Sequence, residues 1–405
     1  MANKILAGSV INAGMVIAGV DADNPPVTGS ESSSSAPTEY LLTGTMWSEG
    51  TGVGSVKTFD TSGALLQSVA VPANITYGYA NFGRNVATNG IKIAVGAPAE
   101  KDGGVSNHGE ITIFNIDGSN PISVIYEDGR EANSGDEVGD ALAMSDNYMY
   151  AGVRKAERYG GGSSGIVAVY DLNGNLQSTL TAPNANASTG GYQFFGIQVG
   201  WTGSRMVASA PQNTGNIYWD CYFRVYEENG TFVEQVELPN VKTKMFGEKM
   251  DVTGPECTSN KVVLSCRNGN AYVYDLDAAD IAGSQVAITV GPDGTTINGV
   301  AINDSYVYVG LSSSDVVKVY DHSGTFQFDI VPTSDVLTAL GETTGSMKFG
   351  ANIEVTNHHL SIVTGSNGKI VIYDTQGNNP VPFDTLGGSY GAYWSGGMQF
   401  YTPQS

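Results

Sequence analysis

The chain has 405 residues, of which 40 are acidic and only 19 are Lys or Arg, and its formal net charge is -21. This shortage of basic side chains argues against a nucleic-acid partner, because phosphate contacts need Lys and Arg. No stretch reaches the ~18 uninterrupted apolar residues of a membrane helix. The 53 glycines and the charged fraction of 15% indicate a turn-rich, all-β protein.

Residues 1–37 differ in pattern from the rest of the chain. Their apolar clusters are separated by Gly8, Gly14 and Gly19, a spacing that fits neither an amphipathic helix nor a single strand, and a Ser-rich linker follows at 30–35. We expect no signal peptide, because Asn12 interrupts the apolar stretch. Such a segment does not fold alone, so we predict an extended arm that docks on its own propeller or on a neighbouring subunit. The candidate docking residues are Ile5, Leu6, Val10, Ile11, Val16 and Ile17.

A short hairpin motif recurs seven times over residues 38–405. In one copy, the alternating segment 166–170 is followed by the turn Asp171-Leu172-Asn173-Gly174 and then by a second apolar-polar run. The copies begin at Phe59, Phe114, Tyr170, Tyr226, Tyr274, Tyr320 and Tyr373. Steps of about 50 residues are typical of one propeller blade, so we predict a seven-bladed β-propeller of four-stranded antiparallel blades.

The first blade lacks an innermost strand of its own. The chain enters the repeat at residues 39–44, which match the second strand of other blades, for example residues 357–362. We therefore predict that C-terminal residues, at 390–394 or 398–400, supply the missing strand. The ring would then be closed by strands from both chain ends, which leaves no open sheet edge.

A second repeated element precedes each hairpin. Phe82-Gly83 is followed by Gly96-Ala97-Pro98, and Phe195-Gly196 is followed by Ser209-Ala210-Pro211. This pattern resembles the FG-GAP repeat of integrin-α-type propellers, a family that often holds calcium between the two elements. Here the intervals 84–90 and 197–205 contain no carboxylate, whereas calcium needs six to eight oxygen ligands. We therefore expect no metal site.

Residues suited to catalysis are sparse. No His-x-x-x-His pair, Ser/His/Asp order or phosphate-binding loop emerges, so we expect neither an enzyme nor a cofactor. The carboxylates Asp136, Glu137 and Asp140 are interpreted as a solvated loop. The four histidines are His108, His322, His358 and His359.

The connections between the second and third strands are long in blades one to four and short in the other three. In a propeller these connections emerge on one face, so the long ones crowd one side of it. They are candidate recognition loops, with a composition suited to contact with protein or sugar. Their candidate contact residues are Trp47, His108, Tyr159, Tyr218 and Trp219.

The repeats are similar to those of FG-GAP-type proteins among the virion components of marine tailed phages. This resemblance implies a noncatalytic virion structural protein, either a capsid decoration or a tail or fibre component, assembled in the host cytoplasm. It would join other virion proteins through the arm, within a multi-subunit assembly, and contact host-surface glycan or protein, with no membrane partner. One alternative is a bacterial extracellular adhesin or glycan-binding propeller. Another is a propeller lyase or glycosidase, which needs convergent carboxylates or histidines around the central channel.

Overall fold

The computed structural model describes only part of the chain. The described residues are 38–45, 54–75, 80–99, 108–126, 137–156, 158–159, 162–182, 194–211, 221–237, 246–343, 345, 347–364, 369–384 and 395–403. The chain divides into two units, Met1–Pro37 and Thr38–Ser405, and every described residue belongs to the second. The predicted arm with its six candidate docking residues therefore lies outside the described residues.

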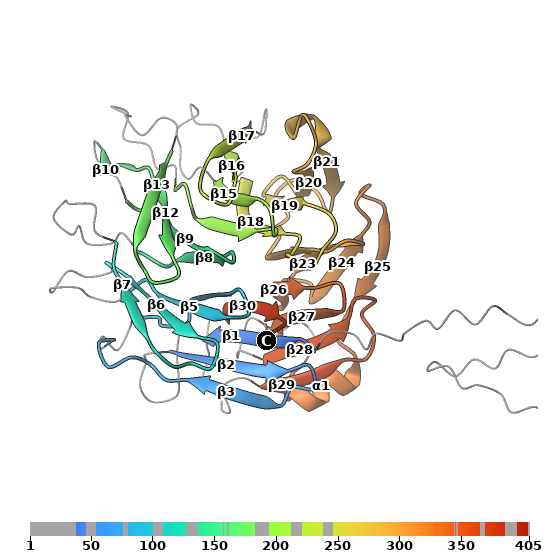
Figure 1. Cartoon of the computed structure of the whole chain (residues 1–405). Helices are drawn as coiled ribbons and strands as arrows, with labels where there is room; N and C mark the ends of the chain where they lie inside the picture. The colour runs from blue at the N-terminus through green and yellow to red at the C-terminus, as the bar shows by residue number, and fades with distance from the viewer. Residues whose placement is uncertain are drawn as a thin grey trace, which may run out of the picture. The chain divides into compact units, whose positions relative to one another are not determined.

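Seven four-stranded antiparallel sheets form a ring of blades, as predicted (Figure 1). From the innermost strand outward, blade one is β30 (Ser395–Tyr401), β1 (Tyr40–Thr45), β2 (Ser55–Asp60) and β3 (Leu65–Val69). Blade two is β4 (Asn85–Thr88), β5 (Lys92–Ala97), β6 (Glu110–Asn115) and β7 (Ile122–Val124), and blade three is β8 (Ala141–Met144), β9 (Tyr148–Val153), β12 (Ile166–Asp171) and β13 (Leu176–Thr181). Blade four is β14 (Gln198–Trp201), β15 (Met206–Ala210), β16 (Tyr222–Tyr226) and β17 (Phe232–Glu237).

The remaining three blades have the same strand order. Blade five is β18 (Phe246–Val252), β19 (Lys261–Cys266), β20 (Asn270–Asp275) and β21 (Val286–Thr289). Blade six is β22 (Gly299–Ile302), β23 (Val307–Leu311), β24 (Val316–Tyr320) and β25 (Phe326–Ile330). Blade seven is β26 (Phe349–Val355), β27 (His359–Thr364), β28 (Lys369–Asp374) and β29 (Val381–Asp384).

The C-terminal strand closes the ring. β30 pairs antiparallel with β1, with Leu41 opposite Phe400 and Leu42 opposite Gln399. The prediction of closure by both chain ends is therefore confirmed, and the closing strand contains the second of the two predicted segments. Blade one is the one blade in which strands from opposite ends of the chain share a sheet.

The recurring hairpin motif has a direct hydrogen-bond explanation. Asp171 Oδ1 accepts hydrogen bonds from the backbone N–H groups of Asn173 and Asn175, both at 2.9 Å. The tight turn that results joins β12 to the outermost strand β13, while Tyr170 before it is buried. Asp60, Asp321 and Asp374 make the same pair of backbone contacts in their blades.

The two glycine elements of the repeat meet across neighbouring blades. A Cβ atom added to Gly152, on β9 of blade three, would lie 1.9 Å from the carbonyl oxygen of Gly196 in blade four. The pairs Gly96 with Gly139, Gly310 with Gly350 and Gly44 with Gly83 show the same approach, at 2.0 to 2.1 Å. Backbones this close exclude any side chain, so both glycines are needed for the blades to pack.

The apolar core is divided among the blade interfaces. Seven clusters of buried side chains each lie between two adjacent blades. The cluster between blades seven and one has the fewest described members: Leu41, Val363, Ile370, Ile372, Met398 and Phe400. Among the described residues, the interface that closes the ring therefore has the smallest apolar core.

Two helical segments and one small hairpin were not predicted. Helix α1 (Ser334–Leu340) begins at Thr333, whose hydroxyl accepts the N–H of Val336, and ends at Gly341. A 3-10 helix, η1 (Ala282–Ser284), joins β20 to β21, and β10 (Arg158–Tyr159) pairs with β11 (Gly162–Ser163). Within the described ranges, no helix is long and apolar enough to cross a membrane.

Candidate functional site: the central channel

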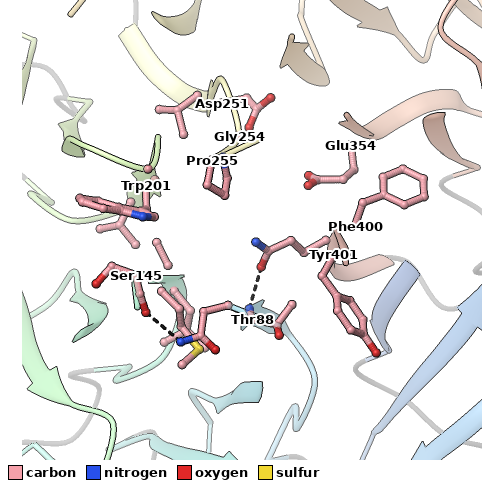
Figure 2. A pocket seen from close by; sticks show the side chains of 18 of the residues that line it. Thr88, Ser145, Trp201, Asp251, Gly254, Pro255, Glu354, Phe400 and Tyr401 are labelled. Carbon is pink, nitrogen blue, oxygen red and sulfur yellow. Dashed lines mark hydrogen bonds between the residues drawn. The ribbon is translucent and has the colours of Figure 1, made fainter. Parts of the chain in front are cut away.

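The innermost strands of the blades surround a cavity of about 1020 Å³. Its wall includes residues of β30, β4, β8, β14, β18, β22 and β26, together with turns that follow several of these strands. Figure 2 shows Glu354 on one side of the cavity, Trp201 on the opposite side and Asp251 between them. This channel is the site in the described part of the chain where carboxyl groups from different blades converge.

One strand position recurs in all seven innermost strands. By its pairing register it is occupied by Gln399, Ala87, Ala143, Gly200, Asp251, Ala301 and Glu354, from blade one to blade seven. The side chain is polar in blades one, five and seven and small in the other four. The channel is therefore chemically asymmetric.

The three polar side chains each reach the next blade around the ring. Asp251 Oδ2 accepts a hydrogen bond from the backbone N–H of Ile302 at 2.9 Å. Gln399 Oε1 accepts one from Thr88 at 2.8 Å (Figure 2), and Glu354 accepts one from Phe400. Each donating N–H lies one residue beyond the equivalent position of the next blade, so the three contacts share one geometry. We call them the interblade ties.

The environment of these carboxyl groups disfavours their charged forms. Asp251 and Glu354 are half-buried side chains in the wall of a cavity that protein encloses on most sides. Burial raises the pKa of Asp251 to about 7, and repulsion from Glu256 adds to the rise. Burial, and repulsion from Asp251 and Glu256, likewise raise the pKa of Glu354 well above its ordinary range. Burial also raises the pKa of Glu256.

Two nearby carboxylates have strong hydrogen-bond donors instead. Glu39 is buried, and its Oε2 lies 2.9 Å from Thr356 Oγ1 and 2.7 Å from His359 Nδ1. Asp304 accepts the N–H groups of Thr258 and Ser259 at 2.8 and 2.9 Å and the amide of Asn357 at 2.8 Å. Although burial opposes it, these hydrogen bonds lower the pKa of Asp304 to about 2. Asp304 therefore joins blades five, six and seven as a fixed charge.

The titratable groups of the channel are held by hydrogen bonds to the scaffold. Asp251 and Glu354 are each bonded to a backbone amide, and His359 is bonded to Glu39. No group of three or more His, Cys, Asp or Glu side chains suited to hold a metal ion occurs in the described ranges. The channel carboxyl groups thus act as ties between blades.

The predicted recognition residues fall mostly outside what the structure describes. Trp47, Tyr218 and Trp219 lie outside the described residues, and so does the side chain of Tyr159, although its backbone is in β10. His108 is buried, with 4% of its surface exposed, and its Nδ1 has no hydrogen-bond partner within the described part. His108 therefore presents almost no surface to a partner.

The interpretation of the acidic loop was wrong for two of its three residues. Asp140 forms ion pairs with Arg84, at 2.5 Å, and with Arg154, at 3.1 Å, and Glu137 pairs with Arg154 and Lys155. These carboxylates belong to a half-buried ion-pair network between blades two and three. Asp136 lies outside the described residues.

Sequence reasoning also missed the channel carboxylates. A signal was present, because Asp251 and Glu354 each stand five residues after the Phe of a Phe-Gly pair and just before a valine. That position lines the channel in five of the seven blades, whereas in blades two and six it is held by the core residues Ala87 and Ala301. An acidic residue there marks a channel carboxyl group.

Comparisons with known proteins bear on the fold alone. No family model matches the chain, so the FG-GAP resemblance rests on the sequence motifs, and no curated protein matches either. A solved structure of a functionally unknown protein from Desulfotomaculum acetoxidans is 10% identical, with a TM-score of 0.53 over 91% of this chain and all (100%) of the other.

Two further solved structures have lower TM-scores. Apo AztD from Citrobacter koseri is 12% identical, with a TM-score of 0.48 over 90% of this chain and 98% of the other. The Cps50 (Swd1) β-propeller domain from Myceliophteria thermophila is 9% identical, with a TM-score of 0.46 over 75% and 85%. By its fold, the protein is a seven-bladed β-propeller.

Proposed function

We propose that the protein is a noncatalytic propeller that serves as an interaction platform. The interblade ties carry this proposal. The carboxyl groups best placed for chemistry in the channel, those of Asp251 and Glu354, are both bonded to backbone amides of the next blade. A carboxyl group that holds the scaffold together is poorly placed to act on a substrate, because turning toward the substrate would break its bond to the next blade and loosen the ring.

The finer part of the proposal is a structural role in the virion of a tailed phage, as a capsid decoration or a tail or fibre component. Its support is the FG-GAP-type repeat pattern and the apolar clusters of residues 1–37. The arm would bind other virion proteins, and the propeller would contact a host-surface glycan or protein. The strongly negative net charge suits this arrangement, because it disfavours contact with packaged nucleic acid.

The virion role is tested by mass spectrometry of purified particles. Full-length protein should occur at a fixed copy number, and a variant lacking residues 1–37 should fold, by its circular dichroism and melting curve, but be missing from the particles. If the shortened protein is incorporated at the normal copy number, the arm is not the attachment element. If the full-length protein is missing from particles, the virion role is wrong.

A glycan-binding propeller is a second candidate, and one observation favours it. Trp201 lies across the channel from Glu354 (Figure 2), and Gln399 lines the same cavity, a combination of aromatic, carboxyl and amide groups that sugar sites use. Binding of the full chain to a glycan array, lost in Trp201→Ala but kept in Trp47→Ala, would support this candidate. An array with no signal above background would rule it out for the sugars tested.

A further inference from the structure

Three carboxyl groups face one part of the channel. Asp251 and Glu256 come from blade five and Glu354 from blade seven, while Ala301 of blade six occupies the equivalent position between the two ties. A small side chain there leaves Asp251 and Glu354 close enough to repel each other, and Glu256 repels both. Like charges that share a confined channel destabilise the folded ring.

The surrounding elements do not neutralise this charge. Asp251, Glu256 and Glu354 form no ion pair within the described part of the chain, and β22 contributes no titratable side chain. Among the other charged or titratable groups around the channel, Arg205 is paired with Glu227 at 2.6 Å and His359 is bonded to Glu39, which itself repels Glu256. Lys249 precedes Asp251 by two residues on β18 and is engaged elsewhere. The remaining groups are the fixed charge Asp304, Asp146, Glu228, Cys257 and Tyr401. Negative charge therefore predominates around the ties.

The ties survive protonation. A neutral carboxyl group still has a carbonyl oxygen that accepts an N–H hydrogen bond, so the contacts to Ile302 and Phe400 need no charge. Proton uptake removes the repulsion but keeps the bond. The tie from Glu354 to Phe400 crosses the interface that closes the ring, where the described apolar core is smallest. Closure at this interface depends least on apolar packing. Removal of the repulsion that acts on Glu354 therefore has its largest effect there.

We propose that uptake of a proton by the carboxyl groups of Asp251 and Glu354 strengthens ring closure, so the propeller is more stable at pH 6.5 than at pH 8. This inference is independent of the proposed function, since it concerns only the scaffold.

The direction follows from linkage. Because the pKa values are raised, the folded state binds more protons than the unfolded state at pH values above the ordinary pKa range of carboxyl groups. The stabilisation is present at low pH and is lost as the pH rises through the folded pKa, near 7 for Asp251. His322 changes stability in the opposite direction, because burial lowers its pKa. Below about pH 6.5 the unfolded chain takes up a proton that the folded state does not, so stability falls as the pH falls. The informative window is therefore pH 8 to 6.5.

The test compares melting temperatures of the full chain and two charge-removing variants at constant ionic strength. The wild-type midpoint should rise from pH 8 to pH 6.5. Asp251→Asn and Glu354→Gln each keep an oxygen that accepts the backbone N–H, and each should raise the midpoint at pH 8 by about 2 °C or more and flatten the pH dependence. Glu237→Gln is the matched control, because Glu237 is exposed on the outermost strand β17. It should follow the wild type.

A wild-type midpoint that is flat or falls from pH 8 to pH 6.5, or channel variants that behave like Glu237→Gln, would overturn the proposal. If a channel variant does not fold, amide exchange of the wild type decides. After correction for intrinsic exchange rates, the peptide 395–401 should be better protected at pH 6.5 than at pH 8, relative to residues 110–115 of β6. Equal or lower protection contradicts the proposal.

Discussion

Glu39 and His359, 320 positions apart in the chain, share a hydrogen bond of 2.7 Å at the interface where the ring closes. Glu39 precedes the first strand of blade one, and His359 begins β27 in blade seven. The same carboxylate is bonded to Thr356 Oγ1. The entry of the chain into the propeller is thereby attached to its last blade.

Removal of the Glu39 carboxylate should destabilise the fold. Glu39→Ala leaves the donors of Thr356 and His359 without their acceptor, and we expect a loss of about 2 kcal/mol in the free energy of unfolding, as for charged hydrogen bonds. Denaturant titration measures this loss. Glu237→Ala on β17 is the control and should change stability by less than about 0.5 kcal/mol. Equal effects of the two substitutions would contradict the role given to Glu39.

A methyl group at Gly152 should also be costly. Its Cβ would lie 1.9 Å from the carbonyl oxygen of Gly196, so blades three and four must move apart. We expect Gly152→Ala to lower the free energy of unfolding by about 3 kcal/mol, in the range of overpacked cores. Gly294→Ala is the control, because nothing lies within 4 Å there, although its positive φ costs about 1 kcal/mol. A smaller loss at Gly152 than at Gly294 would disprove the close-approach explanation.

Deletion of residues 395–405 should abolish cooperative unfolding. It removes β30 and exposes the edge of β1, which is otherwise paired along its length. Size-exclusion chromatography and a melting curve would show aggregation or a broad transition. Deletion of residues 404–405 alone should leave both unchanged. A soluble 395–405 deletion with the parent melting curve would show that β30 is dispensable.

Asp304 should contribute stability that is lost in acid. Its pKa is about 2 in the fold and about 3.9 when unfolded, so the folded state binds fewer protons between these values. The contribution is therefore full above pH 4 and disappears as the pH falls through 2. Asp304→Asn should lower the melting temperature at pH 7, and the difference from the wild type should shrink at pH 2.5. A constant difference would exclude this linkage.

Calcium should not stabilise the protein. In blade two, β4 and β5 are joined only by residues 89–91, whose side-chain oxygens come from one asparagine, Asn89. We expect melting temperatures in calcium and in chelator to agree within about 1 °C, because a ligand that binds the folded state alone would raise the midpoint. A shift above about 5 °C would reveal a site that the described residues do not contain.

The fold could be predicted because its determinants are local. The turn at Asp171 is specified within five residues, and its repetition in the sequence sets the number of blades. The closing strand could be placed because residues 39–44 match a second strand and so require a partner. Helix α1 was missed since it is short and lies in a connection, outside the repeat.

The channel could not be predicted in the same way, because its chemistry arises between blades. Asp251 and Glu354 are 103 positions apart, and the spacing from Phe-Gly that they share does not show that their side chains meet. Only the ring brings them into one cavity. The ion pair of Asp140 with Arg84 was missed for the same reason, since Arg84 comes from blade two and Asp140 from blade three.

The turns of the hairpin motif have a consequence for how the molecule meets charged surroundings. Hydrogen bonds from Ser or Asn side chains lower the pKa of Asp60, Asp117, Asp171 and Asp321, so these groups keep their charge in mild acid. Because each of these turns joins the third strand of a blade to its outermost strand, the charges stand at the outer rim of the ring. Carboxylates that stay ionised there repel anionic surfaces that approach the rim, in mild acid as well as at neutral pH.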